Sequence, residues 1–515
     1  MSRRAFMAVA LLLAWAAGMG LLIHREYFRP HEERLLEAAL LIAPGANYFE
    51  VMHGLRQIGF ASSTLDTVPN GGVEISDFFT ADLVTDGRVQ RATARIYSRM
   101  TRGLRLRAFS FELGPAIGPL KAVGSITDDS VLTLIQTAGR SRPDTQHIQL
   151  SEPLYMPSVV PLAVLLGPAP KIGSTFHFSV FDPTALRPVA ATIRVAAESL
   201  FVVADSARLD TLTGHYEPAH RDTVRAWRLE QEGGGILGGW FDEKGRMVQA
   251  RQFGLFGLRR TAYEIAFRNW QLDARQRTAA ALASEDIVES TAIASSALLG
   301  GGTGDIGLLR VRLRGADLRT FELAGGRQRW RGDTLTVMRE GVAALTTYAL
   351  PADRLRFDTE LSAEPLVEST DPLVVRMARR AASGSRDARD VAERLTRTVH
   401  DYVISTPMFT LPDARQVLLT RRGDCNEHTQ LYVALARAVG LPARAAAGLA
   451  YLDGKFYYHA WPEIWLGSDW VAVDPTFGQF PADAGHLRFV VGGYLKQAEL
   501  IRLVGALKID VLTAR

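Results

Sequence analysis

Three residues near the C-terminal end of the chain, Cys425, His459 and Asp474, are of the types that perform nucleophilic catalysis. Cys425 is the only cysteine among 515 residues. It follows Asp424 at a predicted helix start, where the partial positive charge of the helix end favours the nucleophilic thiolate. Free N–H groups at the same helix end could receive a developing oxyanion. A lone cysteine is nevertheless more often a small buried hydrophobe, so catalysis also requires a base and an orienting group.

His459 and Asp474 could supply that base and orienting group. They lie on two strand-like runs, residues 456–466 and 470–475, which are joined by a turn signal at Gly467. The midpoint of His459 and Asp474 falls beside this turn, so we expect them to be approximate cross-strand neighbours. Such neighbours point to the same face with Cβ atoms about 5 Å apart. The carboxylate could then bind one imidazole nitrogen while the other nitrogen faces the thiol.

Each of these two residues alone is more often structural. A histidine among aromatic residues usually packs, and an aspartate before proline usually ends a strand. Their joint presence favours a nucleophilic triad. In this hypothesis Cys425 attacks a carbonyl, His459 transfers the proton, and Asp474 orients the imidazole and stabilises the imidazolium.

Helices are expected to position the thiol. One begins near Pro372, a second spans residues 387–404, and the third begins at Asp424 and ends at Gly440. Aspartate is a favourable N-cap and glycine a common helix terminator, and the apolar residues between them recur with helical spacing.

Three segments resemble the transglutaminase-like superfamily: RRGDCNEHTQLYVALARAVGLPARAAAGL, HAWPEIWL and DWVAVDPTFG. The resemblance covers about residues 365–480 and implies a papain-like α+β fold, with the thiol helix packed on an antiparallel sheet. It implies that Cys425, His459 and Asp474 form the catalytic triad. The superfamily includes calcium-dependent crosslinkers, thiol peptidases and inactive members. No calcium-loop pattern occurs here, and we expect neither a cofactor nor a bound metal.

The resemblance does not identify a side chain that would donate to the oxyanion. Gln416 and Tyr402 are candidates, but the backbone amide of Cys425 is the better choice. His428 could share the helix face of the thiol, and we expect it to be structural. The tryptophans around the site are expected to form core or pocket wall: Trp461, Trp465 and Trp470.

The N-terminus predicts a membrane anchor. Arg3 and Arg4 precede an uncharged run over residues 5–23, which as a helix would span about 30 Å. We expect residues 1–25 to be an uncleaved anchor, with a signal peptide as the alternative. Basic residues before the run favour a cytoplasmic N-terminus, which would place residues 24–515 outside the cytoplasm.

The rest of the chain divides by its patterning. Residues 30–275 alternate apolar and polar residues and predict a β-rich domain of unknown role, with a bulge in the segment GLRLRAFSFELG. Residues 276–350 are expected to be a linker and a small β segment, and residues 351–515 the catalytic domain. The predicted fold class is therefore α+β, with a large β-rich domain before the catalytic one.

Composition limits the function classes. The net charge is only +4 and no basic tract occurs, which argues against a nucleic-acid partner. A single cysteine excludes an intramolecular disulfide. The sequence therefore favours a membrane-anchored thiol enzyme that acts on amide bonds of proteins or peptides. The alternative is an inactive binding or assembly protein of the cell envelope that works through its β-rich domain. The oligomeric state is not indicated.

Overall fold

The computed structural model describes residues 44–68, 71–85, 88–114, 120–138, 143–166, 170–183, 186–232, 237–252, 256–276, 286–299, 306–364, 366–406 and 413–515. The predicted membrane anchor, residues 1–25, lies outside these ranges. Within them, no helix combines the length and apolar character needed to cross a membrane.

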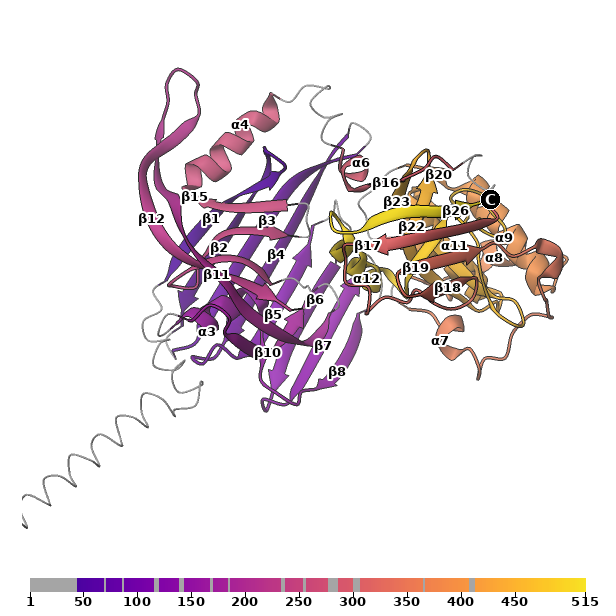
Figure 1. Cartoon of the computed structure of the whole chain (residues 1–515). Coiled ribbons are helices and arrows are strands. Elements are labelled where there is room, and N and C mark those ends of the chain that lie inside the picture. Colours follow the sequence, from indigo (N-terminus) through magenta and orange to yellow (C-terminus); the bar gives the residue numbers. More distant parts are fainter. Residues whose placement is uncertain are drawn as a thin grey trace, which may run out of the picture.

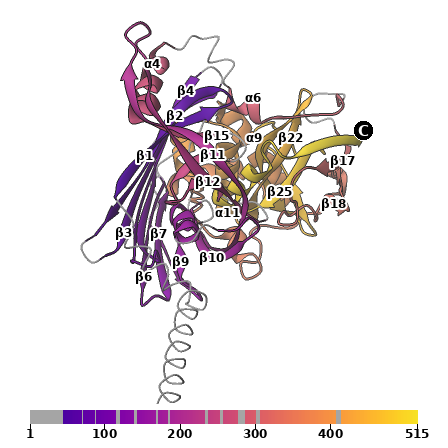
Figure 2. The ribbon, with the colours of Figure 1, turned by 60° about the vertical axis from the view of Figure 1, so that its left-hand side comes forward.

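The N-terminal part is a single 15-stranded sheet that curves around its own core (Figures 1 and 2). Its strand order is β8-β7-β6-β5-β4-β3-β2-β1-β15-β14-β13-β12-β11-β10-β9, and only the β9–β10 pair is parallel. The first eight strands are β1 (Gly45–His53), β2 (Arg56–Thr67), β3 (Val73–Thr85), β4 (Arg88–Met100), β5 (Leu106–Leu113), β6 (Leu120–Thr127), β7 (Val131–Ala138) and β8 (Asp144–Gln149). The others are β9 (Leu154–Tyr155), β10 (Thr175–Asp182), β11 (Arg187–Leu209), β12 (Tyr216–Gln231), β13 (Gly238–Asp242), β14 (Met247–Gln252) and β15 (Phe256–Thr261).

The interior of this curved sheet is filled by side chains and by a short helix. The turn η2 (Pro157–Val159) leads into α3 (Val160–Leu165), and every residue of α3 is buried. One core cluster joins α3 to residues of β3–β7 and of β10–β13. The predicted bulge is confirmed, because Arg99 pairs with Ala108 and Met100 with Leu106, which leaves Arg107 as the extra residue.

Short helices connect the curved sheet to the C-terminal part. The π-helical turn η3 (Glu264–Asn269) and α4 (Trp270–Arg275) follow β15, and α6 (Ile287–Thr291) comes next. Glu289 of α6 binds Lys455 Nζ at 2.5 Å and the Tyr457 hydroxyl at 2.9 Å, which ties this connection to the C-terminal sheet.

The helices expected around the thiol are confirmed. They are α8 (Pro372–Ala381), α9 (Ala388–Tyr402) and α11 (Cys425–Ala438). Each begins after an aspartate whose carboxylate accepts backbone N–H groups, namely Asp371, Asp387 and Asp424. Shorter helical segments that were not expected include η4 (Val342–Ala344), α7 (Asp358–Leu361) and α10 (Ala414–Thr420).

Helix α11 packs on the antiparallel sheet β16-β23-β22-β25, with β24 added on β23. The strands are β16 (Ile293–Ala294), β22 (Ala443–Leu452), β23 (Lys455–Trp465), β24 (Trp470–Ala472) and β25 (His486–Val491). A two-stranded parallel pair, β20 (Ile404–Ser405) and β21 (Arg422–Gly423), leads directly into α11. This is the expected α+β arrangement, in which one core is shared by α8–α11 and β22–β24.

A second small sheet, hereafter the accessory sheet, has the order β18-β19-β17-β26 (Figure 1). Its strands are β17 (Leu308–Arg314), β18 (Gln328–Arg331), β19 (Thr334–Met338) and β26 (Lys508–Ala514), and α12 (Tyr494–Gln497) and η5 (Ala498–Leu503) precede β26. The accessory sheet shares a core with β22, β23 and β25. Strands from residues 276–350 therefore share a core with strands from residues 351–515.

Candidate active site

The start of α11 is held by a capping box. The Asp424 carboxylate accepts from the Asn426 amide at 2.8 Å and from the Glu427 amide, while the Glu427 carboxylate accepts from the Asp424 amide at 2.8 Å. Gly423 is required just before this cap, because a Cβ there would lie 2.2 Å from the Cβ of Glu427. The amides of Asn426 and Glu427 both donate to the Asp424 carboxylate. The amide of Cys425, at the first helical position, can therefore donate to another acceptor.

The thiol of Cys425 lies against β23, where the backbone N–H of Ala460 donates to the sulfur. Burial raises the pKa of the Cys425 thiol well above its usual value, and the negative charges of Asp424, Glu427 and Asp474 add to this effect. This finding differs from the expectation that the helix end would lower the pKa of the thiol. A positively charged imidazole is therefore needed to make the thiolate available.

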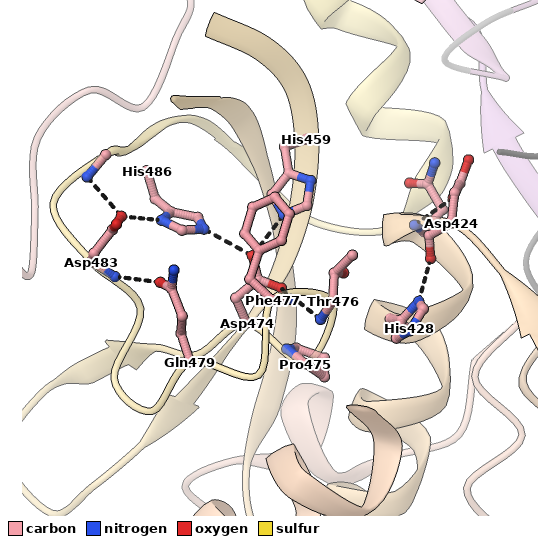
Figure 3. Close-up of polar contacts among 12 residues, drawn as sticks. Asp424, His428, His459, Asp474, Pro475, Thr476, Phe477, Gln479, Asp483 and His486 are labelled. Atoms are coloured by element: carbon pink, nitrogen blue, oxygen red, sulfur yellow. Dashed lines mark hydrogen bonds and ion pairs between the residues drawn. The ribbon is translucent and has the colours of Figure 1, made fainter. Parts of the chain in front are cut away.

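His459 and Asp474 are in direct contact, as predicted. Nε2 of His459 lies 2.7 Å from Oδ2 of Asp474, and both side chains are buried (Figure 3). Because an ionised carboxylate only accepts, Nε2 carries the proton and Nδ1 is the nitrogen left to exchange a proton with the thiol. His459 neighbours Ala460, the residue whose amide contacts the sulfur, so all three predicted residues converge on one place.

The predicted register of this hairpin is wrong by two residues. Trp465 pairs with Trp470 and Glu463 with Ala472, so His459 and Asp474 are not directly opposite. Strand β24 ends at Ala472, and Asp474 instead begins a tight turn that is closed by two backbone hydrogen bonds with Gln479. That turn, rather than strand pairing, brings the carboxylate to the imidazole.

Both carboxylate oxygens of Asp474 are surrounded by donors. Oδ1 accepts from the amides of Thr476 and Phe477 at 2.7 and 3.2 Å, and Oδ2 accepts from His459 and His486. Burial would favour the neutral acid, but the two histidines outweigh it and hold the pKa of Asp474 far below its usual value. The ring of Phe477 stacks on His459, with ring centroids 4.8 Å apart and an angle of 9°. The imidazole is thus fixed from its edge and from its face.

His486 and Asp483 are site residues that the sequence reasoning missed. Nε2 of His486 lies 2.9 Å from Oδ2 of Asp474, and its Nδ1 lies 3.0 Å from Oδ1 of Asp483 (Figure 3). A signal was present, since an aspartate and a histidine three residues apart precede the apolar run of β25. Nothing local in that pattern indicates contact with Asp474, which lies across a turn of the chain.

The other predicted residues take structural places. Nδ1 of His428 contacts the Asp424 carbonyl oxygen at 2.7 Å, and burial lowers the pKa of this imidazole, in keeping with a structural role. The Tyr402 hydroxyl donates to the Leu418 carbonyl at 2.8 Å, and Gln416 is exposed on α10. Neither is placed as an oxyanion donor. Trp461 is buried beside both site histidines, whereas Trp465 and Trp470 pack together and are half-buried.

The ligand atoms of His459, Asp474 and His486 lie within 4.8 Å of one another, which is compact enough to consider a metal ion. Both Nε2 atoms face the same carboxylate oxygen at hydrogen-bond distance and must carry protons, so neither presents a lone pair to a metal. The protonation state of this group therefore fits a hydrogen-bonded chain and does not fit a metal centre.

Comparisons with known proteins agree with the C-terminal geometry. Residues 375–475 match the family model described as the transglutaminase-like superfamily. The chain thus carries a transglutaminase-like domain, and the matched range includes Cys425, His459 and Asp474. Among curated proteins, no match to the chain is found.

Solved structures show only distant similarity. A candidate cysteine protease from Cytophaga hutchinsonii shares 14% identity over 41% of this chain and 87% of its own, with a TM-score of 0.27. A β-barrel-like protein from Brucella abortus shares 11% identity over 42% of this chain and 95% of its own, with a TM-score of 0.29. A candidate protease from Parabacteroides distasonis shares 12% identity over 88% of this chain and 69% of its own, with a TM-score of 0.20. Scores this low do not define the fold.

Proposed function

We propose that this protein is a thiol enzyme that attacks amide bonds of proteins or peptides through an acyl-enzyme on Cys425. The contact that carries the proposal is the 2.7 Å hydrogen bond from His459 Nε2 to Asp474, which leaves Nδ1 for the thiol. Cys425 is the nucleophile, His459 the general base and acid, and Asp474 the residue that holds the reactive tautomer.

The reaction begins with transfer of the Cys425 proton to Nδ1 of His459 as the sulfur attacks the amide carbonyl carbon. The oxyanion of the tetrahedral intermediate accepts from the Cys425 amide at the start of α11. The protonated His459 then gives its proton to the leaving amine, and a thioester remains on the sulfur. Water, deprotonated by His459, attacks the thioester carbonyl carbon. The C–S bond then breaks, the acid leaves, and His459 returns the proton to the sulfur. We favour hydrolysis over transfer to a second amine, because the sequence indicates no dedicated amine site.

Trapping the thioester tests this function. The wild-type protein is incubated with a peptide library, quenched in acid and analysed by mass spectrometry, with Cys425→Ala as the control. We expect an acyl mass on the peptide that contains Cys425, together with cleaved peptides, and loss of both in Cys425→Ala. Because the chain has one cysteine, any thioester maps to a single site. A folded wild-type protein with neither adduct nor cleavage would overturn the proposal and favour a binding or assembly role.

The acyl acceptor is tested in the same reaction with added dansylcadaverine. Hydrolysis predicts free carboxyl termini and little dansyl incorporation. Predominant incorporation into peptides would instead identify a crosslinking enzyme.

We also propose that residues 1–25 anchor the enzyme in the membrane, with residues 24–515 outside the cytoplasm. The proposal is supported by the uncharged run after Arg3 and Arg4. Alkaline phosphatase fused after residue 60 is expected to be active and to remain with the membranes after carbonate washing. Inactive fusions would contradict export, and an active but soluble fusion would indicate a cleaved signal peptide.

A further inference from the structure

His486 is held between two carboxylates. From the first position of β25, its Nε2 faces Asp474 Oδ2 at 2.9 Å and its Nδ1 faces Asp483 Oδ1 at 3.0 Å (Figure 3). All three side chains are buried, with His486 only 2% exposed and Asp474 fully enclosed. These side chains are therefore shielded from bulk water, and the protons in their hydrogen bonds belong to the residues themselves.

Counting hydrogen-bond donors fixes the charge of His486. Asp474 receives four donors, two from backbone amides and two from imidazoles, so it has no place for a proton of its own. Oδ1 of Asp483 also accepts from the Gly485 amide at 2.9 Å. With Asp483 ionised as well, both ring nitrogens of His486 donate, which makes the ring an imidazolium. Burial opposes this charge, but the bonds to Asp474 and Asp483 outweigh it and raise the pKa of His486 to about 9.

We propose that His486 is a positioning residue, an imidazolium at neutral pH that locks the Asp474 carboxylate in place and moderates the negative charge that His459 experiences. The inference rests on the function proposed above. Asp474, His486 and Asp483 together carry one net negative charge, whereas a neutral residue at position 486 would leave two negative charges beside His459. An overly negative partner would hold the proton on His459 too strongly for efficient transfer to the leaving amine.

The accessory sheet fixes His486 in this position. Gln328 at the start of β18 donates to the Arg488 carbonyl at 3.0 Å and accepts from the Arg488 amide at 2.6 Å, two residues after His486. The ring of Trp461 meets that of His486 edge-on, with centroids 5.1 Å apart and an angle of 83°. The accessory sheet thus holds β25 through Gln328, and Trp461 of β23 packs against the His486 ring.

Other charged groups around the site keep their own partners or act more remotely. Glu463 on β23 is paired with Arg444 and Arg488, and on α11 Asp424 and Glu427 form the helix cap. His428 on α11 and Arg327 are influenced by the charges of Asp474 and Asp483, respectively, and His400 on α9 contacts the Pro475 carbonyl oxygen at 3.1 Å. None of these groups lies between His486 and Asp474 in the hydrogen-bonded chain, so the charge of His486 acts on His459 through Asp474.

The protonation of His486 is tested by ¹⁵N NMR of the full chain, labelled at its histidine rings. We expect both ring nitrogens of His486, assigned from their loss in His486→Gln, to show imidazolium shifts at pH 7.5. Neutral-ring shifts for His486 at this pH would overturn the proposal directly, whatever the fate of the variants.

Two near-isosteric variants test the effect on His459 and predict opposite results. In His486→Gln the amide can still donate to Asp474 but the positive charge is lost, so the titration midpoint of the His459 ring should rise by about one pH unit. In Asp483→Asn one negative charge is lost, and the midpoint should fall. A role limited to packing would lower the unfolding temperature without moving the midpoint in either variant, and that outcome would contradict the proposal. His177→Gln, on β10 of the N-terminal sheet, is the control and should leave the midpoint unchanged.

These results can be separated from failure of the proposed function. If no acyl-enzyme forms on Cys425 but His486 is an imidazolium whose loss shifts His459, the charge arrangement is correct and the reaction is not. If the acyl-enzyme forms while His486 is neutral, the reaction stands and the inference fails.

Discussion

Replacing His459 by glutamine is expected to slow alkylation of Cys425 by iodoacetamide at pH 7 about 100-fold. Burial and the charge of Asp424 raise the pKa of this thiol, so without an imidazolium beside it less than about 1% would be thiolate at neutral pH. In the proposed triad, proton transfer to His459 counters that effect. Mass spectrometry measures the reaction cleanly, because the chain contains no second cysteine.

Two controls make this measurement decisive. In a denaturant that unfolds both proteins, the wild type and His459→Gln should react at the same rate, since the folded environment is then absent. His177→Gln, which removes a histidine from the N-terminal sheet, should match the wild type. Equal native rates for wild type and His459→Gln would show that the imidazole does not activate the thiol, and the proposed triad would then be wrong.

The elements that hold the thiol could be predicted because their signals are local. Asp371, Asp387 and Asp424 each lie directly before a helix and cap it through their own carboxylates. The bulge in residues 104–113 could likewise be predicted from the alternation of apolar residues. An extra residue reverses which side chains of a strand face the core. The signals of such features depend on a few neighbouring residues, so they can be read from short segments.

The arrangement around Asp474 could not be predicted because it depends on a turn and on distant strands. The turn signal at Gly467 predicted a hairpin, but not its register, and strand pairing stops before Asp474 is reached. His486 meets Asp474 only because β25 pairs with β22 and is clamped by Gln328, which lies 160 residues away from Arg488. The accessory sheet likewise joins β17 to β26 across most of the C-terminal half of the chain.

The N-terminal sheet likewise has some features with local signals and others that depend on distant contacts. Its β-rich character could be predicted from alternation, whereas the pairing of β1 with β15 and the burial of α3 within the curve depend on closure of the whole sheet. A continuous apolar run such as residues 159–166 is compatible with a strand or a buried helix, and only the surrounding core decides between them.

Replacing Asp474 by asparagine is expected to lower the rate of acyl-enzyme formation about 10³- to 10⁴-fold and to destabilise the fold by about 3–5 kcal/mol. Asparagine has one acceptor oxygen and one donating amino group, whereas all four neighbours of Asp474 are donors. Whichever way the asparagine amide is oriented, its amino group faces N–H donors and cannot accept from them. If it faces the imidazoles, His459 loses the partner that fixes its tautomer, and His486 loses one of the two carboxylates that compensate its buried charge.

Asp469→Asn is the matched control, because Asp469 lies in the same hairpin, is exposed, and uses Oδ1 to accept from the Trp470 amide at 2.8 Å. Asparagine keeps that acceptor, so stability and acylation should both stay near the wild-type values. Urea denaturation at pH 7 and the acid-quench assay measure the two effects separately. Loss of stability with full acylation would make Asp474 a purely structural residue. Loss of acylation in a protein as stable as Asp469→Asn would instead show that the buried carboxylate acts on the chemistry alone, and the estimate of its contribution to folding would be wrong.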